Sequence, residues 1–287
     1  MIGNTLVLQV PAKINLSLDI TGRRADGYHT LSSVFQTVSV YDTLTLTKTG
    51  AETPFSLTCN VDGIPCDERN LVAKAAVALL GESPCGVSIH LEKQIPSQAG
   101  MGGGSADCAA ALLGIRKLLA LPVTDEMLHA MAVKLGADVP FFLVGGTVLA
   151  QGIGDVLTPL APISQRILVI AKGNEGISTP VAYKQIDALT EPLPTYTENV
   201  LAHLGCDDLF SFCGNAFDAV ADNEEIRLIR RIMRQHGANP VLSGSGAAVF
   251  CGMSDLASAQ ACVEELASAG VPFAMVSHTT SCGVKGL

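Results

Sequence analysis

The sequence contains no tryptophan, and aromatic residues make up only 5% of its 287 positions, so its core must be mainly aliphatic. Charged residues are also scarce at 16%, and a formal net charge of −9 disfavours nucleic acid as a partner. No apolar run approaches the ~20 residues of a membrane-spanning helix, and the opening MIGNTLVLQV lacks the basic region of a signal peptide. These absences predict a cytoplasmic globular protein that binds neither nucleic acid nor membrane.

The nine cysteines include no pair at CxxC spacing, so neither a zinc site nor a disulfide framework is predicted. The apolar surroundings of four of them predict that they are buried small hydrophobes, namely Cys59, Cys108, Cys251 and Cys262.

A chain of 287 residues is near the upper limit of one hydrophobic core, which favours two packed lobes. The segment TPLAPISQR, residues 158–166, contains two prolines and is the best candidate for a boundary. We therefore expect an amino-terminal lobe at 1–160 and a carboxy-terminal lobe at 161–287.

The most informative stretch is IPSQAGMGGGSADCAAA at residues 95–111. Its glycines are Gly100, Gly102, Gly103 and Gly104. Alternation at 87–91 predicts a strand before the loop, and apolar spacing at 106–119 predicts a helix after it. Ser105 stands where the N-cap of that helix is expected.

Such a loop is suited to bind anions, because the first turn of a helix leaves backbone N–H groups unpaired and glycine lets a ligand approach the main chain. The polyphosphate of a nucleotide is the natural ligand. The pattern is neither a Walker A loop nor GxGxxG. An ordinary surface loop is the alternative, but three consecutive glycines would make it entropically costly to order.

Residues 11–20, PAKINLSLDI, alternate between apolar and polar side chains and predict a half-buried strand. Lys13 and Asn15 then lie on the same face, about 6.6 Å apart. On the pattern alone, a solvated polar face is the favoured explanation for both residues.

The next segment predicts an antiparallel hairpin, with a turn at Asp26 and Gly27 and two later strands separated by Asp42. Tyr28 and His29 follow the turn and lie at a strand entry. An aromatic face and an imidazole suit the recognition of a nucleobase, although both residues are also common at strand ends.

A helix capped by Thr124 is predicted to end at Gly136, ahead of the segment GADVPFFL. Pro140 disfavours helical backbone at the preceding residue, so Asp138 is expected in a non-helical bend, as a cap or as a catalytic group. Phosphoryl transfer to an alcohol needs a group that accepts the hydroxyl proton, and Asp138 can supply it.

In the second half, Thr179 or Ser178 is expected to cap a helix that has Pro180 in its first turn. The segment VLSGSGAAVF at 241–250 predicts a second glycine turn between strands, which is expected to pack against the first loop, although an ordinary tight turn would show the same pattern. Other predicted elements are helices at 69–80, 224–236 and 256–269 and strands at 167–171 and 273–276.

The string IPxxAGxGGGSADxAAA resembles the phosphate loop of the GHMP kinases, and AKINL, RxDGYHxL and VLSGSGAAVF resemble further motifs of that family. The resemblance covers nearly the whole chain. It implies an α+β, two-lobed GHMP kinase fold, with an amino-terminal lobe like ribosomal protein S5 domain 2 and a ferredoxin-like carboxy-terminal lobe. It also implies an ATP-dependent kinase that uses Mg²⁺ and phosphorylates a small alcohol, as a monomer or homodimer.

The resemblance also implies which residues form the site. Asp138 is the base, with Lys13 beside it, and Ser105 binds the metal. The expected substrate is a diphosphocytidyl compound whose cytosine is held by Tyr28 and His29; the other substrate contacts are Asn15, Thr179 and Pro180. The expected ATP contacts are Ala99, Gly100, Met101, Gly102, Gly103, Gly104, Ser105 and Lys93, although a solvated Lys93 is an equal alternative.

Two alternatives are a GHMP kinase for another alcohol, such as homoserine or a mevalonate derivative, and a catalytically silent nucleotide sensor. The Tyr28–His29 pair argues against the first, and retention of Lys13 and Asp138 argues against the second. The chain departs from the family pattern at Gly173, where proline is usual, and at NAFD, residues 215–218, where NDLE or NDFE is usual. These departures put local packing in doubt.

Overall fold

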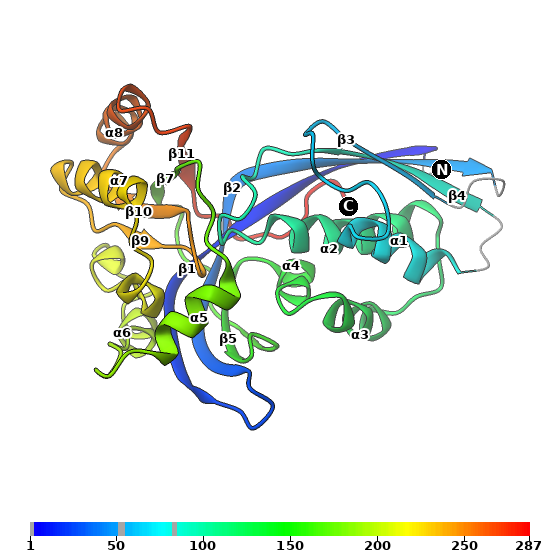
Figure 1. The fold of residues 1–287 in the computed structure, drawn as a ribbon. Helices are drawn as coiled ribbons and strands as arrows, with labels where there is room; N and C mark the ends of the chain where they lie inside the picture. The colour runs from blue at the N-terminus through cyan, green and yellow to red at the C-terminus, as the bar shows by residue number, and fades with distance from the viewer. Residues whose placement is uncertain (1–2, 51–54, 82–84) are drawn as a thin grey trace.

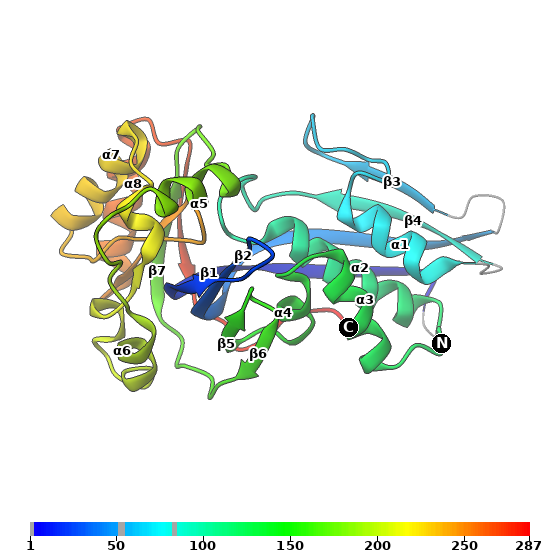
Figure 2. The ribbon, with the colours of Figure 1, turned by 60° about the horizontal axis from the view of Figure 1, so that its bottom comes forward.

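A computed structural model describes residues 3–50, 55–81 and 85–287 and divides the molecule into two lobes, each built on a sheet (Figure 1). The seven-stranded sheet carries helices α1 to α4, and the four-stranded sheet carries α7 and α8 (Figures 1 and 2). Within the described residues, no helix is long and apolar enough to cross a membrane.

Two long antiparallel strands, β1 (Thr5–Arg23) and β2 (His29–Gly50), form the centre of the larger sheet. The predicted hairpin and its turn at Gly27, which has φ of +91°, are confirmed. The expected break at Asp42 is wrong, because β2 continues through it and pairs Asp42 with Val10 of β1.

The polar face of β1 is buried, which corrects the expectation of a half-buried strand. Lys13, Asn15 and Asp19 are each no more than 5% exposed. These polar residues are covered on both sides of the strand, because a register shift follows Asn15. Lys13 and Asn15 line one pocket with Leu18, which belongs to the core around the smaller sheet, while Asp19 accepts the amides of residues 196 and 197. The alternating pattern correctly predicted the strand, but it did not show that other parts of the chain cover the polar residues.

The larger sheet has the order β3-β4-β2-β1-β8, with β5 paired to β2 and β6 to β5. Its remaining strands are β3 (Phe55–Cys59), β4 (Cys85–Glu92), β5 (Thr147–Gly152), β6 (Val156–Pro159) and β8 (Gly214–Asn215). The covering helices are α1 (Leu71–Leu80), α2 (Gly103–Leu118), α3 (Asp125–Leu135) and α4 (Val139–Val144). The core between them is mainly aliphatic, as the composition predicted, and includes Cys108, whose predicted burial is confirmed. The prediction that Cys59 is buried is wrong, because Cys59 is only half-buried.

Local signals account for both ends of α3. Thr124 accepts a hydrogen bond from the Met127 amide at the start of α3, and Gly136 ends that helix, as predicted. The N-cap prediction for Ser105 is wrong. Helix α2 begins at Gly103, and Gly102, with φ of +71°, occupies the N-cap without a side-chain bond, so Ser105 lies within the first turn.

The smaller sheet has the antiparallel order β11-β7-β10-β9. Its strands and outer helices are β7 (Ile167–Lys172), β9 (Val241–Leu242), β10 (Val249–Met253), β11 (Phe273–His278), α7 (Glu224–Gln235) and α8 (Leu256–Ser268). A βαββαβ path with this order is ferredoxin-like, as expected. Cys251 and Cys262 are buried in its core, which confirms that prediction.

The lobes share backbone hydrogen bonds as well as side-chain contacts. Strand β8 adds in parallel to β1, and the chain end returns to the first lobe, where Lys285 bridges Gln9 (Figure 1). Four short helices lie on the path that joins the lobes, namely α5 (Thr179–Asp187), α6 (Thr197–Ala202), η1 (Leu209–Ser211) and η2 (Ala216–Ala219).

Candidate active site

Two glycines of the loop between β4 and α2 have no space for a side chain, each because of a different neighbour. At Gly100, with φ of +71°, a Cβ would lie 1.9 Å from the Ser243 carbonyl oxygen, and at Gly102 it would lie 2.7 Å from the Phe142 ring. The first helical bond runs from the Ala106 amide to the Gly102 carbonyl. The amides of residues 103–105 therefore have no partner within the helix and can bind an anion.

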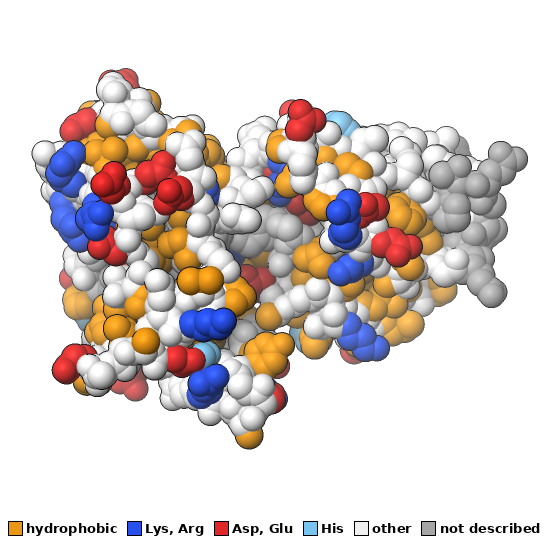
Figure 3. All heavy atoms as spheres, in the orientation of Figure 1, with side chains coloured by type: hydrophobic (Ala, Val, Ile, Leu, Met, Phe, Trp, Pro, Cys, Tyr) orange, Lys and Arg blue, Asp and Glu red, His pale blue; other side chains and the backbone are white. Residues whose placement is uncertain are grey.

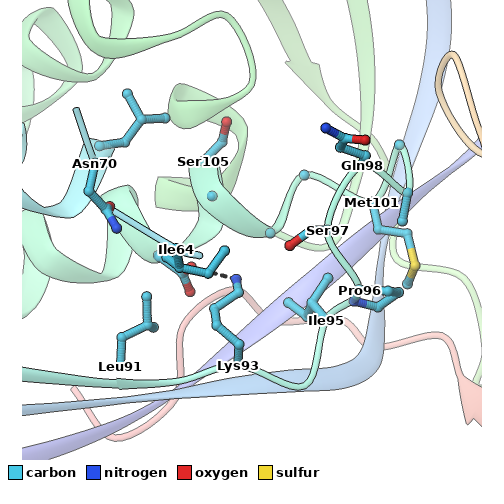
Figure 4. A pocket seen from close by; sticks show the side chains of 17 residues that line it. Ile64, Asn70, Leu91, Lys93, Ile95, Pro96, Ser97, Gln98, Met101 and Ser105 are labelled. Carbon is cyan, nitrogen blue, oxygen red and sulfur yellow. Dashed lines mark hydrogen bonds and ion pairs between the residues drawn. The ribbon is translucent and has the colours of Figure 1, made fainter. Parts of the chain in front are cut away.

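A pocket of about 340 Å³ lies against this loop (Figure 4). Ile64, Leu71 and Leu91 give it an apolar side, and Asn70 and Ser105 add polar groups. All the predicted ATP contacts line it: Lys93, Ala99, Gly100, Met101, Gly102, Gly103, Gly104 and Ser105. An apolar wall beside free amides suits a base or ribose next to phosphates.

Lys93 is not a solvated lysine, because its side chain is 9% exposed and lies between two carboxylates. Its Nζ is 2.6 Å from Asp107 Oδ2, the contact drawn in Figure 4, and it also contacts Asp42. Burial lowers the pKa of Lys93, but Asp107 and Asp42 outweigh it and hold the pKa above its usual value. Burial also raises the pKa of Asp107, against the opposing effect of Lys93.

The cluster of Lys93, Asp42 and Asp107 holds the two ends of the glycine loop together. Asp42 Oδ1 accepts the amides of Gln94 and Ile95 at 2.6 and 2.8 Å, while Asp107 lies near the start of α2. The sequence analysis missed both acids. An aspartate in the middle of the apolar run VYDTLTL was the available signal for Asp42, since a buried carboxylate requires partners.

The second glycine turn packs directly against the first, as predicted. Ser243 Oγ donates to the Gly100 carbonyl at 3.0 Å, and the amides of Ala247 and Ala248 donate to Gln98 and Ala99 at 3.2 and 3.1 Å. Close approach of the two main chains explains why Gly100 has no space for a side chain.

A second pocket, of about 200 Å³, contains Lys13, Asn15 and Asp138. Lys13 Nζ donates to Asn15 Oδ1 at 2.7 Å and lies 3.8 Å from Asp138 Oδ2. Asn15 Oδ1 also accepts the Gly244 amide at 2.8 Å, so one side chain joins Lys13 to the second glycine turn. Burial lowers the pKa of Lys13, and the charge of Asp138 opposes that shift.

Asp138 has a helical conformation, with φ of −84° and ψ of −12°, which corrects the expected non-helical bend. Pro140 is tolerated because it lies in the first turn of α4, where its missing N–H is not needed. The Asp138 side chain makes no capping bond and is 33% exposed. The capping alternative is therefore excluded, and the carboxylate is accessible from the pocket.

A third pocket, of about 550 Å³, contains Tyr28 and His29 together with Thr179 and Pro180. Tyr28 is 63% exposed, whereas the side chain of His29 is 9% exposed. Two residues that the sequence analysis missed, Tyr183 and Asp187, hold the His29 ring. They lie four residues apart on α5, so they share a helix face.

Ser178 occupies the N-cap of α5 and Pro180 lies in its first turn, as predicted, but Ser178 makes no side-chain capping bond. Instead, Thr179 Oγ1 forms a 2.7 Å hydrogen bond with Ser245 Oγ of the second glycine turn. Ser245 is thus a further pocket residue that sequence reasoning missed, and it links α5 to the turn that supports the phosphate loop.

The three pockets adjoin one another. The first and second share Gly100 and Gly102, and the second and third share Ile153, Thr179 and Tyr183. The middle pocket is lined by residues of both lobes, and Figure 3 shows the surface hollowed between them. The structure therefore brings every predicted site residue to one of three consecutive compartments.

The two departures from the family pattern have local explanations. A Cβ at Gly173 would lie 2.2 Å from Glu225 Oε2, and that carboxylate accepts the amides of Asn174 and Glu175. At NAFD, Asn215 donates to two carbonyls beside the second glycine turn, and Asp218 pairs with Arg230. Gly173 and Asp218 lie outside the three pockets, whereas Phe217 of NAFD lines the second one.

The chain is similar to known proteins of one family. Residues 70–146 match the family described as GHMP kinases N terminal domain. A 4-diphosphocytidyl-2-C-methyl-D-erythritol kinase from Clostridium perfringens is 38% identical over 264 residues, which cover 89% of this chain and 91% of the relative.

Solved structures of kinases are also similar to this chain. A crystal structure of 4-(cytidine 5'-diphospho)-2C-methyl-D-erythritol kinase is similar with a TM-score of 0.76 and 32% identity, covering 96% of this chain and 99% of that one. Homoserine kinase from Cytophaga hutchinsonii gives a TM-score of 0.73 at 19% identity, covering 99% and 98%. The second likeness concerns the fold alone.

Proposed function

The chain belongs to the 4-diphosphocytidyl-2-C-methyl-D-erythritol kinases of the GHMP kinase family, and we propose that its three adjoining pockets hold ATP, the reacting hydroxyl and cytosine in that order. It is an ATP-dependent kinase of isoprenoid precursor synthesis that acts on an alcohol group. The acceptor is the 2-hydroxyl of 4-diphosphocytidyl-2-C-methyl-D-erythritol. The observation that carries the assignment is that the pockets share Gly100, Gly102, Thr179 and Tyr183.

The phosphates of ATP bind the free amides of residues 103–105, where the helix dipole of α2 also favours negative charge. The transferred γ-phosphoryl group then lies toward Gly102, which borders both the nucleotide pocket and the pocket of Lys13. Lys93 is proposed to support the phosphate loop from below, because its ammonium is already paired with Asp42 and Asp107.

Ser105 is the proposed protein ligand of Mg²⁺. Its hydroxyl lies in the nucleotide pocket and has no hydrogen-bond partner among the described residues, and Mg²⁺ typically takes few protein oxygens beside phosphates and waters. When bound, the ion would neutralise charge on the phosphoryl group that is transferred.

Asp138 accepts the proton of the attacking hydroxyl, and Lys13 stabilises charge that develops on the phosphoryl oxygens. The 3.8 Å separation between Lys13 Nζ and Asp138 Oδ2 exceeds a hydrogen bond, so the carboxylate oxygen remains available to the substrate. Asn15 holds Lys13 in place by a 2.7 Å bond. Thr179 and Pro180 contact the part of the substrate between its alcohol and its base.

Tyr28 offers an exposed aromatic face on which cytosine stacks, and His29 contacts the edge of the base. These two residues favour the diphosphocytidyl substrate over homoserine or mevalonate, which carry no base. The presence of Lys13 and Asp138 in one pocket favours a working kinase over a silent sensor. We also propose a monomeric or homodimeric enzyme in the cytoplasm.

The test is ADP release by the purified protein with ATP, Mg²⁺ and one of three acceptors: the diphosphocytidyl substrate, homoserine or mevalonate. ADP should form only with the first, and ³¹P NMR should show a phosphate monoester on its 2-hydroxyl. Equal turnover with homoserine or mevalonate contradicts the proposal, as does cytidine binding without any ADP release.

A further inference from the structure

The ring of His29 is fixed by two residues of α5. It stacks on Tyr183 with 4.5 Å between centroids and 12° between planes, which sets the plane of the imidazole. Its Nε2 lies 2.7 Å from Asp187 Oδ1, which sets the rotation within that plane. Tyr183 is itself held by an edge contact with Phe217, at 5.0 Å between centroids.

Asp187 is placed to act on His29 as a carboxylate. Arg23 lies 3.2 Å from Asp187 Oδ2, so the two oxygens of Asp187 have different partners, a guanidinium and an imidazole. A carboxylate oxygen can only accept a hydrogen bond, so the proton of this contact must reside on His29 Nε2.

A neutral imidazole with its proton on Nε2 presents an unprotonated Nδ1, which is a hydrogen-bond acceptor. Among the described residues, nothing bonds to His29 Nδ1, and His29 lines the pocket beside the exposed face of Tyr28. An acceptor at this position suits the 4-amino group of cytosine, a donor, and opposes the 4-oxo group of uracil, an acceptor.

We propose that Asp187 is the positioning residue for base recognition: by accepting the Nε2 proton of His29, it leaves Nδ1 to accept the cytosine 4-amino group and so excludes uracil. The proposal rests on the function proposed above. It assigns no contact between Asp187 and the substrate, and it gives α5 a role at both ends, since Thr179 at its start contacts Ser245.

The first measurement is the tautomer itself, read from the ¹⁵N shifts of His29 at the alkaline plateau of a pH titration, with His29→Gln used for assignment. The parent should show a protonated Nε2 and an unprotonated Nδ1. Asp187→Ala should shift the ring toward a mixture of tautomers, and Asp187→Asn should retain part of the parent signal, because an amide oxygen can still accept the proton. A parent with its proton on Nδ1 overturns the proposal.

The second measurement is kcat/KM on the cytidylyl substrate and its uridylyl counterpart. Asp187→Ala should lower the preference for cytosine by roughly tenfold, the value of one lost hydrogen bond, with Asp187→Asn falling between it and the parent. The KM for ATP should stay unchanged. A preference that survives Asp187→Ala, or a fall in kcat on both substrates alike, overturns the proposal.

Two matched variants separate this role from simple packing or charge. Arg23→Met removes the other partner of Asp187 but leaves the bond to His29, so the tautomer and the cytosine preference should both persist. Asp222→Ala breaks a similar Asp–Arg pair, with Arg227, outside the pocket and should have no effect. If Arg23→Met reproduces Asp187→Ala, the ion pair and not the tautomer sets the preference.

Failure of this proposal differs from failure of the proposed function. A parent that phosphorylates both nucleotidyl substrates equally is a kinase without the proposed selectivity. A parent that phosphorylates neither contradicts the function itself.

Discussion

Replacing Gly104 by valine separates phosphate binding from folding better than any other change in the glycine loop. A Cβ at Gly104 would meet no atom within 4 Å, and the residue lies in the first turn of α2. Valine is a better helix former than glycine by a few tenths of a kcal/mol, so the free energy of unfolding should be unchanged or slightly higher.

ATP binding should nevertheless weaken, because Gly104 lines the nucleotide pocket beside the free amides of α2. Losing one charge-assisted bond between an amide and a phosphate costs about 1.5 to 3 kcal/mol, which corresponds to an affinity loss of about ten- to 150-fold. Isothermal titration with a non-hydrolysable ATP analogue measures the affinity, and thermal unfolding by circular dichroism measures the stability.

Other glycines of the loop serve as controls. Gly100→Ala should prevent folding, because its Cβ would lie 1.9 Å from the Ser243 carbonyl oxygen at a φ of +71°. Gly103→Val should disturb packing, since its Cβ would lie 3.0 Å from Ile95 Cγ2 and 3.1 Å from Lys93 Nζ. Unchanged ATP affinity in a stably folded Gly104→Val variant would refute the assignment of this loop to the phosphates.

Three further predictions concern single side chains. Asp138→Asn should lower kcat by about 10² to 10⁴, because the amide cannot accept the hydroxyl proton. The melting temperature should change little, since the Asp138 side chain makes no capping bond. A shifted melting temperature with a normal kcat contradicts this prediction. Tyr28→Ala should raise the KM for the cytidylyl substrate by about ten- to a hundredfold and leave the KM for ATP unchanged, as measured by steady-state kinetics. An equal rise in the KM for the cytidylyl substrate and in the KM for ATP would refute stacking of cytosine on Tyr28.

The third uses pH. Burial raises the pKa of Asp218 to about 6, with Arg230 opposing, so the folded state keeps a proton that the unfolded chain loses near pH 4. Stability should therefore fall by up to about 3 kcal/mol as the pH rises from 4 to 6, and Asp218→Asn should flatten that slope in urea unfolding. An identical slope in parent and variant contradicts this.

Local patterns in the sequence were sufficient for the elements that carry the site. Alternation placed Lys13 and Asn15 on one face, and their side chains are bonded at 2.7 Å. Turn and cap signals found the hairpin before His29 and the helix from Thr124 to Gly136. These features depend on neighbouring residues, so the sequence shows them directly.

What the sequence could not predict depends on contacts between distant segments. Asp42 and Asp107 are 51 and 14 positions from Lys93, and no periodicity indicates that their charges meet. Likewise, Asp187 contacts His29 across 158 positions. The error at Ser105 was different, because a glycine in left-handed backbone took the N-cap position that side-chain preference assigns to serine.

The most direct test of the account is a crystal structure with cytidine diphosphate and a non-hydrolysable ATP analogue bound together. The account predicts the triphosphate against residues 99–105, the cytosine beside Tyr28 and His29, and Lys13 and Asp138 between the two nucleotides. Two nucleotides that compete for one pocket, or a cytosine bound away from His29, would contradict it.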